Sequence, residues 1–101
     1  MAIVTNKSGT NEITITLGNR FDFNCAEDFR KAYEKVDEGD KKDFVLDFRH
    51  THYIDSSTLG MLAIMDKYWQ DRGSVIRIIN SNPQLKRIFA ITEFNNKFKI
   101  D

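Results

Sequence analysis

The alternation of hydrophobic and polar residues predicts two strands at the start of the chain. In residues 12–17, isoleucine or leucine occupies every odd position and a polar residue every even one, the period of a half-buried strand. Residues 3–5 carry two further β-branched apolar side chains before the turn-prone segment Asn6-Lys7-Ser8-Gly9. We therefore expect an N-terminal β-hairpin that pairs residues 3–5 with residues 12–17.

Apolar residues at helical spacing predict a first and a last helix on either side of a longer one. Asn24 and Glu27 match a capping box, and the apolar positions that follow are Cys25, Phe29, Ala32, Tyr33 and Val36. Residues 38–40, Glu-Gly-Asp, should end this helix. The last helix should begin at Pro83 behind the cap Asn82, and its expected buried stripe is Leu85, Ile88 and Phe89.

The remaining apolar runs predict buried strands and complete the order of elements. Residues 44–48 and 75–79 are short and rich in bulky or β-branched side chains, and residues 98–100 fit a last edge strand. The order is then β-β-α-β-α-β-α-β. Because strand–helix–strand units favour parallel pairing, we expect an α/β fold with a mixed sheet, helices packed against it, and one domain over residues 1–101.

The longest predicted helix runs from Ser56 to Gly73, and Gly73 is a residue typical of C-caps. At about 100° per residue, its expected core face holds Ser57, Met61, Ile64, Met65 and Tyr68, extended by Leu62 and Trp69. The opposite side holds Ser56, with Leu59, Gly60, Ala63, Lys67 and Gln70 nearby. Small and apolar residues near an exposed hydroxyl suggest a flat docking surface for a partner.

Ser56 is the candidate switch of this surface. It stands at a helix N-terminus, where the helix dipole favours negative charge, so the fold should tolerate a phosphate there. A phosphate would add about −1.5 to −2 charges, and a docked partner would have to desolvate them. The alternative is purely structural: Asp55 or Ser56 caps the helix, as Asp and Ser commonly do.

Composition narrows the classes of function. The 101 residues contain 15 basic and 15 acidic side chains, so the balanced charge predicts no general affinity for nucleic acid or anionic membranes. Residues 1–5 lack the features of a signal peptide, and no apolar run approaches the roughly 20 residues of a membrane span. The single Cys25 fits a reducing compartment and a core position. We expect a cytoplasmic protein with no direct membrane insertion.

The other polar clusters predict neither a metal site nor catalysis. His50 and His52 stand near Asp55, but neither cysteine nor a third histidine completes a set of metal ligands. A histidine near Ser56 is not accompanied by a nucleophile elbow or an oxyanion-hole glycine cluster. The glycines are dispersed through turns and form no phosphate-binding loop. The sequence therefore predicts a binding protein without a cofactor rather than an enzyme.

Several of these segments together resemble the STAS domains of bacterial anti-sigma factor antagonists. The resemblance rests on Val45-Leu46-Asp47-Phe48, on Tyr53-Ile54-Asp55-Ser56-Ser57-Thr58-Leu59-Gly60, and on the later segments 75–79 and 82–89. It covers nearly the whole chain from Glu12 onward. An Asp-Ser-Ser tripeptide on its own is weak evidence for the family. The same tripeptide between a predicted strand and a predicted helix, as in this chain, is a quite specific combination.

The resemblance implies a function and a modification site. In that family a partner kinase, which doubles as the anti-sigma factor, phosphorylates the serine after the aspartate, and a phosphatase reverses the reaction. The corresponding residue here is Ser56, with Asp55 holding the local turn and Asp22 near the site. The implied partner surface is Asp22, Asp55, Ser56, Ser57, Thr58, Leu59, Gly60 and Ala63. Stand-alone STAS domains also serve lipid-transporting ABC complexes by docking on the ATPase, and this alternative would leave Ser56 as a cap.

The chain departs from the family pattern at two points. Thr58 stands where the family often has glycine, so packing at the helix start could differ and Thr58 is a possible second acceptor. The sequence ends at Asp101, without the C-terminal helix of many members, so part of the sheet should be less covered. The sequence does not determine the oligomeric state, the identity of the kinase and phosphatase, or the process controlled.

Overall fold

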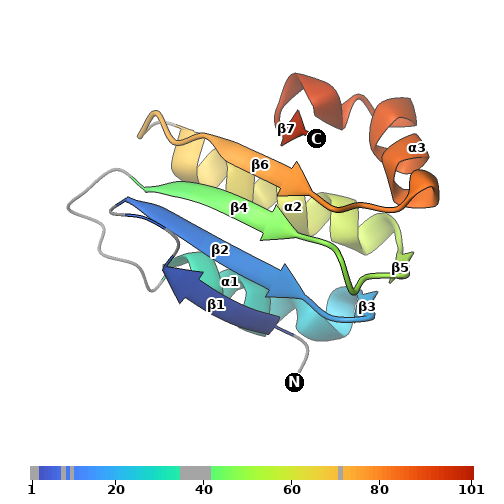
Figure 1. The fold of residues 1–101 in the computed structure, drawn as a ribbon, viewed down its shortest axis with the longest axis horizontal. Coiled ribbons are helices and arrows are strands. Elements are labelled where there is room, and N and C mark those ends of the chain that lie inside the picture. Colours follow the sequence, from blue (N-terminus) through green and yellow to red (C-terminus); the bar gives the residue numbers. More distant parts are fainter. Residues whose placement is uncertain (1–2, 8, 10, 35–41, 71) are drawn as a thin grey trace.

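The computed structural model of this chain describes residues 3–7, 9, 11–34, 42–70 and 72–101. Within them the chain alternates strands and helices (Figure 1). The elements are β1 (Ile3–Lys7), β2 (Glu12–Leu17), β3 (Arg20–Phe21), the 3₁₀ helix η1 (Phe23–Cys25), α1 (Ala26–Glu34), β4 (Asp43–Asp47), β5 (Tyr53–Ile54), α2 (Ser56–Gln70), β6 (Ile76–Ile79), α3 (Pro83–Ile91), the 3₁₀ helix η2 (Phe94–Asn96) and β7 (Lys99–Ile100).

The main sheet is mixed, as predicted. Its strand order is β1-β2-β4-β6-β7; β1 pairs with β2 antiparallel, and every other neighbouring pair is parallel. The short strands β3 and β5 form a separate parallel pair at one end of the molecule (Figure 1). The α/β class, the mixed sheet and the predicted order of the main elements are therefore confirmed.

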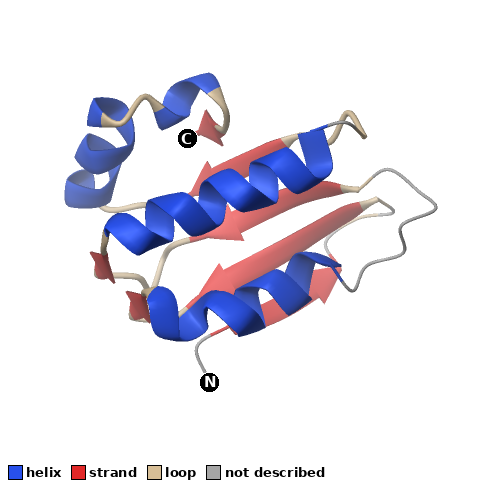
Figure 2. Cartoon of the chain, turned by 180° about the vertical axis from the view of Figure 1, so that it is seen from behind, coloured by secondary structure: helices blue, strands red, loops and turns tan. Residues whose placement is uncertain are grey.

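Helices α1 and α2 lie side by side across one face of the main sheet, and α3 sits beyond the β6 side (Figure 2). The core fills the space between sheet and helices. The Trp69 ring packs 5.1 Å from that of Phe44, and its Nε1 donates to the Tyr33 carbonyl at 3.3 Å. This one residue of α2 thus ties the sheet to α1. Burying aromatic side chains of this size contributes a large share of the stability of a small domain.

Most predicted elements and caps appear where the sequence placed them. The hairpin pairs Thr5 with Ile15, and the alternation along β2 puts its odd residues in the core. Asn82 caps α3 by accepting a 2.8 Å hydrogen bond from the Leu85 amide. Gly73 adopts a φ of 73°, the left-handed conformation expected beyond the end of α2. In each case a local signal sufficed.

The predicted start of the first helix is wrong. Asn24 is not its cap; it lies inside η1, whose N-cap is Asp22, and Asp22 Oδ1 accepts the Asn24 amide at 3.0 Å. An aspartate two residues earlier satisfies the first free amide, so the chain turns sooner than the capping-box pattern indicated. Val36 and residues 38–40, assigned to the end of this helix, lie outside the described residues.

The predicted core face of α2 is also partly wrong. Ile64 is 62% exposed, whereas Thr58, placed in no core stripe, is completely buried. Leu59, expected on the outer side, packs partly against the core. The buried side of α2 is therefore centred on Met65 and includes Thr58. Thr58 can lie in the core because its hydroxyl is hydrogen-bonded. Ser56 lies opposite this side and is exposed, as predicted.

Candidate functional site

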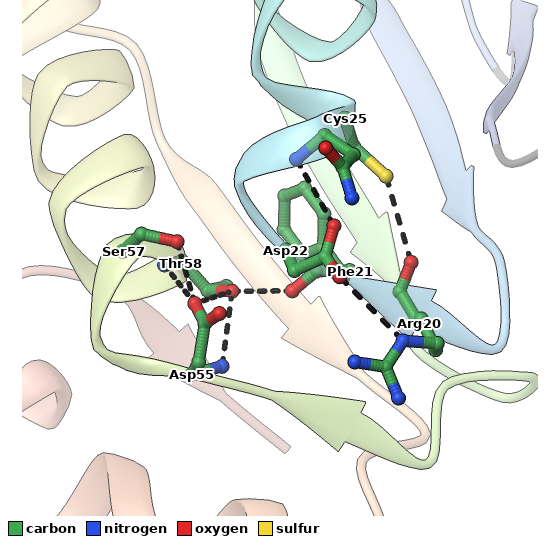
Figure 3. Close-up of polar contacts among 8 residues, drawn as sticks. Arg20, Phe21, Asp22, Cys25, Asp55, Ser57 and Thr58 are labelled. Carbon is green, nitrogen blue, oxygen red and sulfur yellow. Dashed lines mark hydrogen bonds and ion pairs between the residues drawn. The ribbon is translucent and has the colours of Figure 1, made fainter.

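The Asp-Ser-Ser segment lies at the corner where β3, β5 and α2 meet (Figure 3). Parallel pairing aligns Phe21 with Ile54. Asp22 and Asp55 are therefore the residues that follow two paired strand ends. This register brings two segments more than thirty positions apart in the sequence to the same corner.

Asp55 is the N-cap of α2. Its Oδ1 accepts the Thr58 amide at 3.2 Å and the Ser57 hydroxyl at 2.5 Å. These hydrogen bonds, that from the Ser57 hydroxyl most of all, hold the pKa of Asp55 below its usual value. Asp55 is therefore ionised at neutral pH and places a negative charge directly before Ser56. Of the two caps considered from the sequence, the structure selects Asp55.

Thr58 fastens the first turn of α2 to β3. It is completely buried, its Oγ1 donates to the Phe21 carbonyl, and it accepts the Asp55 amide at 3.3 Å. Its side chain is therefore not part of the surface, which corrects its place in the predicted partner-binding set. A buried hydroxyl held by two backbone groups is also not accessible to a kinase. The Thr58 hydroxyl thus adds two hydrogen bonds to the corner that a glycine at this position could not make.

Ser56 is chemically different from the two hydroxyl residues that follow it. It is exposed, and its hydroxyl makes no hydrogen bond with any of the described residues. The hydroxyls of Ser57 and Thr58 are both engaged. Within this segment, Ser56 is the hydroxyl that a modifying enzyme can reach without breaking an existing interaction.

Asp22 is held in place from two sides. Besides capping η1, its carboxylate forms a 3.5 Å ion pair with the Arg20 Nε, and the Arg20 guanidinium lies 4.1 Å from the centroid of the Tyr53 ring. Sequence reasoning placed neither Arg20 nor Tyr53 at the site. Their contact depends on the pairing of β3 with β5, two strands of two residues each that carry too short a pattern to be recognised.

The remaining residues of the predicted surface, Leu59, Gly60 and Ala63, carry no charge. Gly60 is exposed, and Leu59 and Ala63 are half-buried on the same helix. A Cβ added at Gly60 would meet nothing within 4 Å, so neither packing nor backbone conformation requires glycine there. A small residue at this position keeps the surface beside Ser56 low, which suits close approach of another molecule.

Asp47, from the segment at 45–48 that contributes to the family resemblance, has a structural role. It is 4% exposed, and its carboxylate accepts the Arg49 amide at 3.0 Å, the Arg49 Nε at 2.8 Å and the Asn80 Nδ2 at 3.0 Å. Burial alone would raise the pKa of Asp47, but the hydrogen bonds from Asn80 and Arg49 outweigh it and lower the pKa. This network joins the ends of β4 and β6.

The histidines do not converge on a metal site. His52 Nδ1 lies 2.8 Å from Asn19 Oδ1 on the exposed side of the loop. Among the residues that the structure describes, no three histidine, cysteine or acidic side chains are grouped so as to hold a metal ion. Nor is any helix in the described ranges long and apolar enough to cross a membrane.

Comparisons with known proteins agree with this architecture. The sequence profile of a family described as "Mlab, STAS domain" matches residues 4–100. A STAS-domain containing protein of Pseudomonas aeruginosa (strain UCBPP-PA14) is 39% identical over 89 residues, which cover 88% of this chain and 87% of that protein.

Solved structures share the fold at low sequence identity. A Thermotoga maritima protein assigned to the anti-sigma factor antagonists superposes with a TM-score of 0.81 at 20% identity, covering 97% of this chain and 84% of that one. The anti-sigma factor antagonist SpoIIAA, unphosphorylated, gives a TM-score of 0.74 at 13% identity over 99% of this chain and 87% of its own. Phosphorylated SpoIIAA of Bacillus gives 0.74 at 16% identity, over 99% and 91%. The chain belongs to the STAS-domain family.

Proposed function

We propose that this protein is a regulatory binding protein of the anti-sigma factor antagonist type, switched by reversible phosphorylation at Ser56. Its partners would be a serine kinase that doubles as the anti-sigma factor, and a phosphatase. The observation that carries the proposal is the exposed, unpartnered hydroxyl of Ser56 beside two engaged ones. STAS domains are typically binding or regulatory modules without catalysis, which agrees with this role.

The chemistry required of this chain is limited to supplying an acceptor. The Ser56 Oγ would attack the γ-phosphorus of ATP held by the kinase, forming an O–P bond as the bond to the ADP oxygen breaks. The hydroxyl proton would pass to a base of the kinase. Hydrolysis by the phosphatase would return the hydroxyl and release inorganic phosphate.

The position of Ser56 would let a phosphate change binding without unfolding the protein. Ser56 is the first residue of α2, where the helix dipole favours negative charge. The phosphate would join the ionised Asp55 and bring about −1.5 to −2 further charges beside the uncharged residues Leu59, Gly60 and Ala63. SpoIIAA, which shares this fold, has been solved in both unphosphorylated and phosphorylated forms. A partner fitted to the unmodified surface would have to desolvate the added charge.

Affinity purification from native cells with matched variants tests the proposal. Ser56→Ala should retain the kinase-like partner, and Ser56→Asp should lose at least tenfold in affinity, since one desolvated charge typically costs more than the roughly 1.4 kcal/mol that a factor of ten represents. Gln84→Ala, an exposed position on α3 outside the predicted partner surface, is the control and should bind the partner as the unaltered protein does. Equal binding by the alanine and aspartate variants at position 56 would contradict the switch.

A second function is favoured by the family description, "Mlab, STAS domain". In it the protein would be an accessory subunit of a lipid-transporting ABC complex, docked on its ATPase. The surface around Ser56 would then be a permanent interface, and Ser56 would remain unmodified. Co-purification of a transporter ATPase with Ser56 free of phosphate under all growth conditions would support this function over the first.

A further inference from the structure

A groove with a volume of about 340 Å³ lies between α1 and α2, on the helical side of the molecule, and has no part in the Ser56 site. Figure 2 shows the two helices that form its walls. Its size falls within the range of small-molecule sites, which are mostly apolar with a few well-placed polar groups. The residues that line it follow the same division.

The apolar part of the groove comes from both helices. Phe29 and Met61 are buried at its base, and Ala26 is half-buried beside them. Ile64 stands in the wall and is 62% exposed. A single exposed isoleucine is common in soluble proteins, but this one borders a concave apolar surface, where a ligand could cover it.

The polar part consists of two groups that lack partners. Tyr33 is only 2% exposed as a whole residue, but its hydroxyl is not among the fully buried polar atoms without a partner, and it makes no hydrogen bond with the described residues, so its oxygen reaches the groove. Arg30, one turn earlier on the same face of α1, is exposed and forms no ion pair within the described ranges. Glu27 also lines the groove, but its carboxylate pairs with Lys31 at 3.7 Å. The groove thus combines a hydroxyl donor and a cation, neither of which has a partner among the described residues.

Burial keeps Tyr33 in its neutral, donating form. Burial is the main cause that raises the pKa of Tyr33, Glu34 raises it further, and Arg30 lowers it in part. Because the Tyr33 hydroxyl reaches the groove and has no acceptor among the described residues, an oxygen of a bound ligand can accept its hydrogen bond. The chemistry that matches a neutral donor and a guanidinium beside an apolar surface is an oxyanion carried on a hydrocarbon chain.

We propose that this groove binds a long-chain carboxylate, with the alkyl chain against Phe29, Met61 and Ile64. The carboxylate accepts from the Tyr33 hydroxyl and pairs with the Arg30 guanidinium. The inference does not depend on phosphorylation of Ser56, so a Ser56→Ala variant should bind the ligand as the unaltered protein does.

Titration of the full chain with octanoate, decanoate and dodecanoate, each below its micelle concentration, tests the site by ¹H–¹⁵N NMR. Saturable shifts should cluster on α1 and α2. Affinity should rise by up to about fourfold for each added methylene, the factor given by burying one CH₂. Decanol, which has a chain of the same length but no charge, should bind more weakly than decanoate.

Matched variants separate the site from non-specific association. Tyr33→Phe removes an oxygen without a hydrogen bond and should fold normally, so its expected loss of affinity for decanoate reports on the ligand. Arg30→Gln should also weaken decanoate while leaving decanol unchanged, and Arg87→Gln on α3 should change neither. Shifts spread over the whole surface, no saturation, or decanoate affinity unaffected in both groove variants would overturn the proposal.

Discussion

The hydroxyl of Thr58 offers a direct test of how the corner beneath Ser56 is held together. Thr58→Val keeps the volume of the side chain and removes only its hydrogen-bonding group. The Phe21 carbonyl would lose its buried donor, and the Asp55 amide would lose an acceptor. A buried polar group left unsatisfied costs about 1–3 kcal/mol. Because Thr58 is completely buried, water cannot replace the lost partner.

We therefore expect Thr58→Val to lower the free energy of unfolding by about 1–3 kcal/mol. In a domain of this size each kcal/mol corresponds to roughly 4–8 °C in Tm. Urea denaturation followed by circular dichroism measures the change, with the slope against denaturant unchanged if the native state stays compact.

Thr58→Ser is the matched control, since it keeps the hydroxyl and removes one methyl group. It should lose stability only through the methyl, about 1 kcal/mol. If the valine variant were as stable as the unaltered protein, the Thr58 hydroxyl would contribute no stability, and the reasoning about this corner would be refuted.

Three further predictions concern the rest of the scaffold. Asp47→Asn should destabilise the protein by about 1–3 kcal/mol at neutral pH. The pKa of Asp47 is lowered in the folded state, so the stability that its carboxylate contributes is present above the unfolded pKa of about 3.9 and is lost as the pH falls through the lower folded pKa. The free energies of unfolding of the two proteins should therefore converge below about pH 4. A constant difference in stability down to pH 2 would contradict the network. Asn82→Ala should cost about 1 kcal/mol by removing the cap of α3, which thermal melting measures against the exposed-site control Gln84→Ala. Gly73→Ala should cost about 1–2 kcal/mol because φ is 73° while the site is sterically open, and an alanine variant of unchanged Tm would show that this backbone conformation is not required.

The sequence determined the sheet and the three longer helices because their signals are local. Alternation along residues 12–17, the cap at Asn82 and the glycine at position 73 each depend on residues close in the chain. The start of α1 was misplaced because two nearby residues, Asp22 and Asn24, carry equally good capping side chains. The sequence pattern alone does not choose between them.

The exposure of Ser56 at the start of α2 was predictable from the sequence, and the contacts around it were not. Ser56 follows from helical spacing and from the family resemblance alike. The buried role of Thr58 could not be predicted, because it requires knowing that the Phe21 carbonyl lies across the corner. The contact of Arg20 with Tyr53 likewise depends on the pairing of two strands too short to leave a periodic pattern.

The central claim is tested most directly by mapping phosphate on the protein purified from its native cells under different growth conditions. Intact-mass and tryptic-peptide mass spectrometry would locate it. The account predicts a phosphate on Ser56 in a fraction that varies with conditions, none on Ser57 or Thr58, and a kinase-like protein bound to the unmodified form. A Ser56 that is unmodified under every condition, with the partner bound regardless, would contradict it.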